Sequence, residues 1–341
     1  MSNNQSASGE CKPVLNVLFL GGARRVAFAQ KLKAAAAHRG AECRLFSFES
    51  SPCVAIASEA TVLTGGRFTD AATLDELAAI IDRYKINVVL PFVDPAIEVA
   101  AKLKALKPDV YIPVSSPEVA AMTFDKVLTD ERLAAAGLPR PERITNLGEA
   151  EFPIIFKPRR GSASKGIQVV YTREAAQQKA LIGNANYLAQ SYIANACELT
   201  VDCFIDADGK VKACVPRTRL EVVGGEAVKT MTVYVPQAVA LAKEVIAECG
   251  LQGAVTIQLI CDCDIQPSQR QWLVMEINAR LGGGVVASIN AGADIPGLIV
   301  DSALGRPAEM QSYEPNVMTA RYLADVVIPI NKESDENADN C

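Results

Sequence analysis

The sequence predicts an α/β protein with two domains, an N-terminal parallel α/β domain and a second domain of antiparallel hairpins and helices. Between residues 14 and 116, short apolar runs alternate with amphipathic stretches, separated by glycine or proline. This alternation is typical of a parallel sheet with crossover helices. Beyond residue 150, apolar runs follow one another across short polar turns, which indicates antiparallel pairing. The length of 341 residues also favours more than one domain.

In the first domain, strands are expected where apolar residues run together, at 14–20, 43–49, 61–65, 87–92 and 109–115. Amphipathic spacing predicts helices over 23–38 and 73–84, and a third helix after Asp94. Ligands of such parallel sheets bind outside the carboxyl ends of the strands.

The turn after the first strand reads Gly21-Gly22-Ala23-Arg24-Arg25. It lacks the third glycine of the Gly-x-Gly-x-x-Gly dinucleotide fingerprint. Two interpretations stay open. The stretch is either a tight strand-to-helix turn or a site where Arg24 or Arg25 meets a ligand anion at a helix N-terminus.

The pattern changes near residue 117, where a short helix and then a helix over 124–136 are predicted, the second ended by Gly137 and Pro139. Further helices are expected over 173–182, 236–249 and 292–305. Strands are expected at 151–158, 167–172, 187–193, 198–206, 210–217, 253–264 and 272–280. The first two of these strands, the pair joined by Asp208-Gly209, and the last two are each predicted to form hairpins.

Composition excludes several classes of protein. A formal net charge of −5 does not favour a nucleic-acid partner. Apolar runs such as 14–20 are too short to span a bilayer, so no membrane association is expected. The first ten residues lack the features of a secretory signal. We therefore expect a cytoplasmic protein with a disordered lead over 1–12 and a disordered acidic tail over 331–341.

The ten cysteines are scattered without a Cys-x-x-Cys motif, so they are expected to be free thiols. The single histidine, His38, is expected at the exposed C-terminal end of a helix. These observations exclude Ser-His-Asp and Cys-His catalysis. Any bound metal is expected to be a hard cation held by carboxylate and amide oxygens.

Residues 152–166, FPIIFKPRRGSASKG, place Lys157 in a strand just before a loop of glycine and serine. Such a loop presents backbone N–H groups without bulky side chains, and phosphate oxygens bind such donors. Arg159, Arg160 and Lys165 add positive charge. The loop does not fit a Walker A motif. A solvated basic hairpin is the alternative interpretation.

The stretch WLVMEINAR, residues 272–280, predicts a strand with one polar face. Strict alternation places Leu273, Met275 and Ile277 toward the core. It places Glu276, Asn278 and Arg280 together on the opposite face.

Polar groups in line on one face of a strand need partners. Glu276 and Asn278 suit Mg²⁺ carried by a nucleotide, with Gln258 of the preceding strand expected across from Glu276. Arg280 suits a transferring phosphoryl group. The glycines at 282–284 allow a backbone to approach a ligand closely. The alternative is a solvent-exposed polar face on an edge strand.

These stretches, in this order, resemble the ATP-grasp superfamily, in particular its carbamoyl-phosphate-synthase-like and amino-acid-ligase members. The resemblance covers about residues 14–325. Its marks are FDK (124–126), FPIIFKPRRGSASKGI (152–167), AQSYIANACELTVD (189–202), VPRTRLEVVGG (215–225), QLICD (258–262) and VMEINARLGGG (274–284). It implies a Rossmann-like pre-ATP-grasp domain over 13–116 and an ATP-grasp domain of two α+β subdomains over 117–330, with a flexible lid over about 143–190.

The resemblance also implies roles for residues that bind the nucleotide. Lys126 and Lys157 look like the two lysines that grip the ATP phosphates. The loop over 161–166 resembles the flap above them, with Gly161, Ser162, Ser164 and Gly166 as its binding residues. The backbone of Gln190, Ser191, Tyr192 and Ile193 matches the hinge that reads adenine, and Glu198 matches the acid that holds the ribose. Many relatives carry an acid where Gln190 stands and a glycine where Cys197 stands.

The remaining roles concern the metal and the chemistry. Gln258, Glu276 and Asn278 match the magnesium positions. Arg280 matches the catalytic arginine. Arg217 and Arg219 match arginines that face the acyl phosphate or a substrate carboxylate.

The resemblance implies a carboxylate–amine ligase that uses ATP and Mg²⁺, with Mn²⁺ as an alternative ion, and forms an acyl phosphate on a small carboxylate before an amine displaces phosphate. A carbamoyl-phosphate-synthase-like activation of bicarbonate or carbamate is the second interpretation. A non-catalytic ATP-binding sensor or scaffold is the third. Small-molecule carboxylates and amines are the expected partners, and the sequence is compatible with a homodimer.

Overall fold

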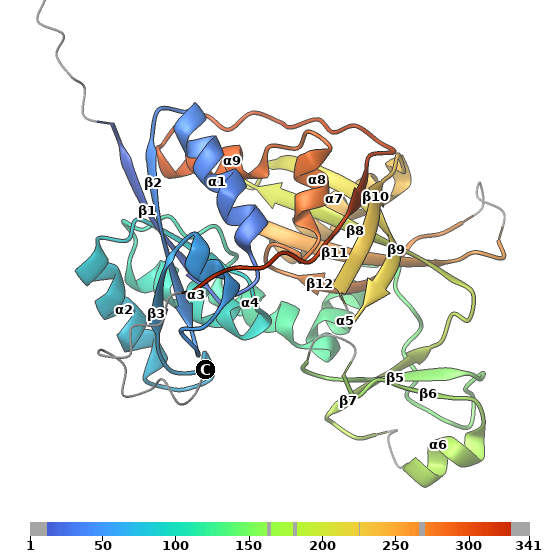
Figure 1. Ribbon diagram of the computed structural model, residues 1–341. Helices are drawn as coiled ribbons and strands as arrows, with labels where there is room; N and C mark the ends of the chain where they lie inside the picture. Colours follow the sequence, from blue (N-terminus) through green and yellow to red (C-terminus); the bar gives the residue numbers. More distant parts are fainter. Residues whose placement is uncertain (1–11, 162–164, 180–182, 225, 266–269, 329–341) are drawn as a thin grey trace, which may run out of the picture.

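The computed structural model describes residues 12–328 apart from 162–164, 180–182, 225 and 266–269. Its strands form three sheets, and each sheet is built from strands that are consecutive along the chain. Figure 1 shows a parallel sheet beside a larger antiparallel sheet, and a small third sheet that projects from both. The predicted lead over 1–12, except Lys12, and the predicted tail over 331–341 lie outside the described residues.

The N-terminal sheet has four parallel strands in the order β3-β2-β1-β4. The strands are β1 (Val14–Leu20), β2 (Glu42–Glu49), β3 (Thr61–Thr64) and β4 (Val88–Pro91). The helices are α1 (Val26–His38), α2 (Thr73–Tyr84) and α3 (Asp94–Leu106), with a 3₁₀ turn at Ala55–Ser58. The predicted parallel α/β arrangement is confirmed, and His38 ends α1 on the surface as expected.

The prediction of a strand at 109–115 is wrong. Only Tyr111 bridges to β4, at Val88. Pro113 has no N–H to give to a ladder. Its carbonyl instead accepts a hydrogen bond of 3.2 Å from Ala254 of the next sheet. The approach requires glycine at the neighbouring Gly253, because a Cβ there would lie 1.8 Å from the Pro113 carbonyl oxygen.

The central sheet is antiparallel, with strand order β12-β11-β8-β9-β10-β13. Its strands are β8 (Ala196–Ile205), β9 (Val211–Val223), β10 (Glu226–Thr232), β11 (Gly253–Asp262), β12 (Leu273–Asn278) and β13 (Met318–Ala320). Four helices lie around it, α4 (Pro117–Phe124), α7 (Pro236–Cys249), α8 (Val285–Asn290) and α9 (Ile295–Ala303). Strands β10 and β13 and helix α8 were not predicted from the sequence. Within the part of the chain described here, no helix is long and apolar enough to cross a membrane.

The two faces of the central sheet belong to two different cores. On β8, Cys203 and Ile205 face a core formed with α7, while Phe204 faces a core shared with α1 and β1. This second core also takes in residues of α9, which packs beside α1 (Figure 1). The N-terminal sheet and the central sheet are therefore joined through one continuous apolar core.

The expected face pattern of β12 is partly wrong. Val274 and Ile277 are the buried residues, whereas Leu273 and Met275 are half-exposed. The ladder with β11 pairs Gln258 with Glu276 but Leu259 with Val274, so Met275 is an extra residue in a β-bulge. A bulge reverses the alternation on one side of it, which strict period-two reasoning cannot anticipate.

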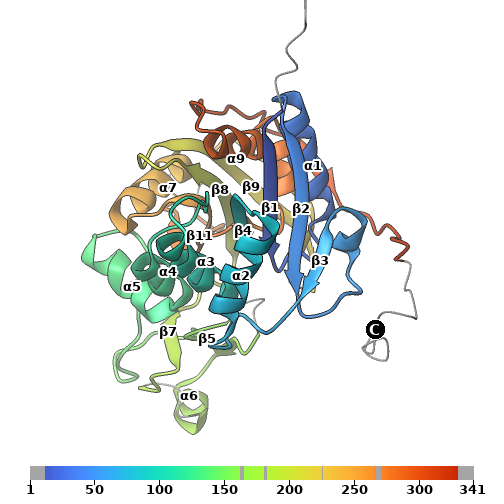
Figure 2. The ribbon, with the colours of Figure 1, turned by 90° about the vertical axis from the view of Figure 1, so that its left-hand side faces the viewer.

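The third sheet has the order β6-β5-β7 and carries its own small apolar core. Its strands are β5 (Ile154–Pro158), β6 (Gln168–Val170) and β7 (Tyr187–Ser191), and α6 (Arg173–Lys179) follows β6. The predicted hairpin of β5 and β6 is confirmed. In both views the sheet extends away from the rest of the molecule, with α6 at its outer end (Figures 1 and 2). Helix α5 (Lys126–Ala135) packs against β7.

The prediction that all cysteines are free is wrong. Cys197 and Cys263 form a disulfide across 66 residues of sequence, and Cys53 is also disulfide-bonded. Sequence spacing did not reveal the pair because β8 and β11 are neighbours only in the folded sheet. Among the described residues, the free thiols are Cys43, Cys203, Cys214, Cys249 and Cys261.

The disulfide gives a testable prediction. Changing Cys197 to Ser removes a cross-link that closes a long loop, so the free energy of unfolding should fall by about 2–4 kcal/mol. Urea unfolding without reductant measures the difference, and Cys261→Ser, at the free thiol of β11 that pairs with Cys197 across the ladder, is the matched control. Equal stability of wild type and Cys197→Ser under oxidising conditions would contradict the cross-link.

Candidate functional site

The two lysines and the carboxylate singled out in the sequence lie close together. A pocket between α5, β7 and β12 is lined by Lys126, Gln190 and Glu276, with apolar walls from Leu133, Leu188, Val274 and Ile277. Lys157, on β5, bonds to the Gln190 side chain. Residues that are about 150 positions apart in sequence therefore face one cleft.

Lys126 is placed by the start of helix α5. Asp125 caps the helix, because its carboxylate accepts from the backbone N–H groups of Val127 (3.0 Å) and Leu128 (3.2 Å). The same carboxylate lies 2.5 Å from Arg159, which follows β5. Helix and strand are thus held together, and the Lys126 ammonium reaches the Gly161 carbonyl (2.9 Å) and the Glu276 carboxylate (3.3 Å).

Lys157 is almost fully buried, with 6% of its surface exposed. Its ammonium donates a 2.9 Å hydrogen bond to Gln190 Oε1. Burial, together with the neighbouring Lys126 ammonium, lowers the pKa of Lys157 to about 8, against the attraction of the Glu276 carboxylate. A buried ammonium of this kind favours an anion that enters the cleft.

The strands β11 and β12 bring the predicted metal donors side by side. Gln258 is paired with Glu276, and Thr256 with Asn278. Glu276 and Asn278 are both half-exposed. One carboxylate and two amide oxygens suit Mg²⁺, which is typically held by one or two carboxylates together with substrate phosphates.

The predicted flap is described only at its two ends. Ser162 and Ser164 lie outside the described residues. Gly161 has φ +136° and offers its carbonyl to Lys126. Gly166 has φ +76°, and a Cβ there would lie 2.9 Å from Pro158. Both positions therefore require glycine.

The predicted hinge, Gln190–Ile193, takes in the last two residues of β7 and the two residues after it. The backbone N–H groups of Ser191 and Tyr192 donate to the carbonyls of Glu142 (2.9 Å) and Pro153 (3.2 Å), and Ile193 is half-buried. Glu198, on β8, forms an ion pair with Arg219 of β9. The roles given to these residues in adenine and ribose binding stay predictions.

Arg280 connects the site to the N-terminal domain. Its guanidinium pairs with Asp94, the first residue of α3, and lies 3.5 Å from Asn278 Oδ1. Asp94 is buried at the carboxyl end of β4. The parallel sheet thereby fixes the position of the arginine that the sequence predicts to be catalytic.

Arg217 is placed differently from Arg219. It is 3% exposed and donates to both carboxylate oxygens of Asp202, at 2.7 and 3.3 Å. Asp202 also accepts from Ser288 (2.7 Å) and Thr256 (3.4 Å). Arg217 lies beneath the glycine loop, because a Cβ on Gly284 would come within 2.6 Å of its guanidinium. Its contact with a substrate stays a prediction.

The Gly21–Arg25 stretch forms a turn that faces the same glycine loop. Gly21 has φ +74°, and the turn begins helix α1. Arg25 lies over the ring of Phe92 and beside Gly283, where a Cβ would be 3.3 Å from its guanidinium. The two interpretations of this stretch are compatible. It is a strand-to-helix turn, and it also places Arg25 beside the glycine loop that follows Arg280.

Sequence reasoning missed the acids that hold these cations, namely Asp94, Asp125, Asp130 and Asp202. A signal existed for Asp202, which interrupts an apolar run on β8. A charge in such a run requires a partner. Asp130 follows Lys126 by four residues, the spacing that places two side chains on one helix face.

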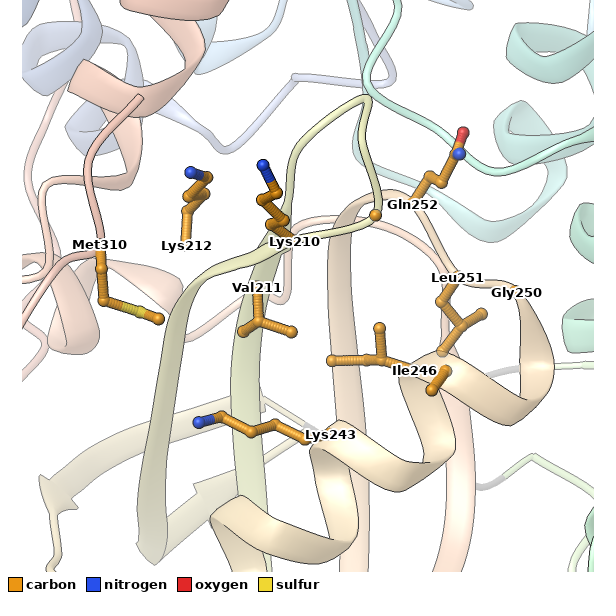
Figure 3. A pocket seen from close by; sticks show the side chains of 11 residues that line it. Lys210, Val211, Lys212, Lys243, Ile246, Gly250, Leu251, Gln252 and Met310 are labelled. Atoms are coloured by element: carbon orange, nitrogen blue, oxygen red, sulfur yellow. The ribbon is translucent and has the colours of Figure 1, made fainter. Parts of the chain in front are cut away.

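A second pocket, of about 690 Å³, lies at the opposite end of the central sheet, between the β8–β9 turn and the C-terminus of α7 (Figure 3). Val211, Ile246 and Leu251 form an apolar floor. The Lys212 ammonium is already 3.2 Å from Asp206. This pocket shares no residue with the cleft at Lys126.

Comparison with known proteins gives a family match and shared folds. Residues 184–326 match the family described as ATP-grasp in the biosynthetic pathway with Ter operon. The L-amino acid ligase of Bacillus licheniformis is similar in structure, with a TM-score of 0.65 and 18% identity over 86% of this chain and 75% of that chain. No curated protein sequence gives a match.

Two further structures were solved with nucleotide. The N5-carboxyaminoimidazole synthetase of Staphylococcus aureus, complexed with ADP, has a TM-score of 0.67 and 18% identity over 91% of this chain and 81% of that chain. The biotin carboxylase domain of Hydrogenobacter thermophilus 2-oxoglutarate carboxylase, complexed with MgADP and bicarbonate, has a TM-score of 0.71 and 16% identity over 90% of this chain and 74% of that chain.

The protein therefore has the fold of the ATP-grasp enzymes, with a parallel N-terminal part followed by antiparallel sheets. The resemblance read from the sequence is confirmed by the family match and by these folds.

The two arginines of β9 give a matched prediction. Arg217→Ala leaves the buried Asp202 carboxylate without its cation, so the free energy of unfolding should fall by about 3–5 kcal/mol. Arg219→Ala removes a half-exposed pair and should cost about 0–1 kcal/mol. Urea unfolding measures both. A similar loss for the two variants would contradict the difference in burial.

Proposed function

We propose that the protein is an ATP-dependent carboxylate–amine ligase. The observation that carries the proposal is that Lys126 and Glu276 line one cleft, with the buried Lys157 beside it through its hydrogen bond to Gln190. Two ammonium groups beside a carboxylate suit a triphosphate with its divalent ion, since phosphate oxygens bind the cations and the carboxylate binds the metal. The ATP-grasp fold and the family match over residues 184–326 support it.

Nucleotide binding is assigned to the cleft between the small sheet and the central sheet. Lys126 and Lys157 hold the phosphates, together with the predicted flap over 161–166. Glu198 holds the ribose, and the hinge over residues 190–193 binds adenine. Structures with this fold have been solved with ADP and MgADP, which supports this assignment.

Glu276, Asn278 and Gln258 would hold Mg²⁺, or Mn²⁺ in its place. The donor set fits because the Glu276 carboxylate already faces an ammonium at 3.3 Å, so the position favours positive charge. The ion would neutralise phosphate charge and orient the terminal phosphoryl group.

In the proposed reaction, a substrate carboxylate oxygen attacks the terminal phosphorus of ATP, and ADP leaves. An amine then attacks the carbon of the acyl phosphate, phosphate leaves, and the amine loses a proton. The protein contributes position and charge rather than a nucleophile. Arg280, held by Asp94, is placed to stabilise the transferring group, and the buried Arg217 supports the glycine loop on which the substrate would lie.

Activation of bicarbonate or carbamate is the second candidate function. One observation favours it, because the structurally similar biotin carboxylase domain was solved with bicarbonate. ADP release that requires bicarbonate, and that no amino acid stimulates, would select this candidate. A protein that binds ATP but releases no ADP with any acceptor would instead be a sensor or scaffold.

The proposed function predicts the effect of removing the charge of Lys157 or of Glu276. Lys157→Ala and Glu276→Ala should each lower ATP turnover at least 100-fold, because each removes a charge that meets the triphosphate or its metal. The substrates for this assay are identified first, by a screen for ADP release. The screen tests amino acids and dipeptides, singly and in pairs, and the masses of the products are measured. Lys210→Ala, at the exposed β8–β9 turn, serves as the control for loss of a cation elsewhere on the sheet. Normal turnover by a folded Lys157→Ala protein would refute the assignment.

The proposed function also predicts how ATP affinity depends on pH. The pKa of Lys157 is lowered by burial to about 8, so its charge is present below pH 8 and lost above it. ATP affinity should therefore fall above about pH 8, approaching tenfold for each pH unit. Stability should change in the opposite sense, because the folded state binds fewer protons than the unfolded state between about pH 8 and 10.5.

Calorimetric titration with ATP from pH 7 to 10 measures the affinity. Lys157→Ala lacks the titrating group and should give a flatter profile. Parallel profiles for the two proteins would contradict the role of Lys157.

A further inference from the structure

The side chain of Gln190 links the buried Lys157 to a buried aspartate. Gln190 is 3% exposed. Its Oε1 accepts from the Lys157 ammonium at 2.9 Å, and its Nε2 donates to Asp130 Oδ1 at 2.9 Å. Asp130 itself is 3% exposed. Three polar side chains from β5, β7 and α5 therefore form one continuous hydrogen-bonded chain.

The orientation of the Gln190 amide is fixed by its neighbours. A lysine ammonium only donates hydrogen bonds, and a carboxylate only accepts them. The amide oxygen must therefore face Lys157 and the amide nitrogen must face Asp130. A flipped amide would place donor against donor and acceptor against acceptor in a buried place, which is costly.

Asp130 is anchored from its other side. Arg140 donates to Asp130 Oδ1 at 3.2 Å, and Arg143 lies 3.7 Å from Oδ2. Arg143 also bridges to the backbone of Gln190. The segment that leads from α5 into the small sheet is thus tied to the same aspartate that orients Gln190.

We propose that Gln190 and Asp130 are positioning residues that hold the Lys157 ammonium where it meets the nucleotide phosphates. The inference rests on the proposed function and deepens it. Helix α5 would then act on the phosphates twice, directly through Lys126 and indirectly through Asp130, one turn later on the same face.

The residue type at position 190 fits this role. A neutral amide holds the ammonium by a hydrogen bond and leaves its positive charge for a ligand. A carboxylate at the same place would form an ion pair with Lys157, and a phosphate would have to compete with it. The side chain of Gln190 therefore has a task separate from that of the hinge backbone.

The test compares ATP with adenosine, which lacks phosphates. Gln190→Met keeps the volume of the side chain but removes both hydrogen bonds. We expect ATP to bind about tenfold more weakly to this variant, which corresponds to the loss of one charge-assisted hydrogen bond. Adenosine, measured by competition with a fluorescent ATP analogue, should bind within twofold of wild type. A hinge that is merely disrupted would weaken both ligands.

Asp130 offers a matched pair of variants. Both of its hydrogen bonds, from Gln190 and Arg140, go to Oδ1, and Oδ2 has no hydrogen-bond partner. Asp130→Asn keeps an oxygen at Oδ1 but removes the negative charge beside Arg140 and Arg143, and it should weaken ATP binding less than Asp130→Ala does. Asp130→Ala removes the acceptor and should weaken ATP binding as Gln190→Met does. Thermal unfolding checks that each variant is folded.

A double-mutant cycle shows whether Gln190 acts through Lys157. In a Lys157→Ala background, adding Gln190→Met should change ATP affinity less than twofold, because the group it positions is gone. Additive losses, or equal losses for ATP and adenosine, would overturn the inference. If wild type binds no ATP, the proposed function fails as well. If wild type binds ATP and Gln190→Met binds it equally well, only the inference fails.

Discussion

The burial of the Lys157 ammonium is the constraint on which the rest of the site depends. An ammonium that is withdrawn from water is stable only where hydrogen-bond acceptors and negative charge surround it. Gln190 supplies the acceptor, and Glu276, Asp130 and Glu198 supply the charge from three other elements. Each of these elements must be in place before the lysine can be buried. The cleft is therefore specified by the small sheet, the central sheet and helix α5 together.

The same logic recurs with other cations of the chain. Arg217 is paired with Asp202, Arg280 with Asp94, and Arg159 with Asp125, and each acid is nearly fully buried. In each case the acid comes from a different element than the cation, so the pair fixes one element against another. The aromatic and aliphatic cores set the layers, and these pairs set the positions of the charged groups within the layers.

Much of the fold could be predicted, because most helices and strands carry a clear period of 3.6 or 2 and end at glycine or proline. The pairing of Gln258 with Glu276 followed from hairpin geometry. The errors have physical causes. Pro113 turned an apolar run away from its sheet, and the bulge at Met275 exchanged the faces of β12 for Leu273 and Val274 only. Short edge strands such as β13 have too few residues to show a period. The disulfide of Cys197 and Cys263 depends on sheet order, which no local pattern encodes.

The pair of Arg280 and Asp94 has a wider consequence for modularity. The N-terminal domain shares an apolar core with the central sheet and also supplies the Asp94 carboxylate that holds Arg280, the arginine proposed to stabilise the transferring phosphoryl group. A chimera that replaced this domain with one from a distant relative would need a matching acid at the start of its third helix. Under the proposed function, the N-terminal domain and the arginine that it holds would therefore change together during evolution, and the domain could not be exchanged independently.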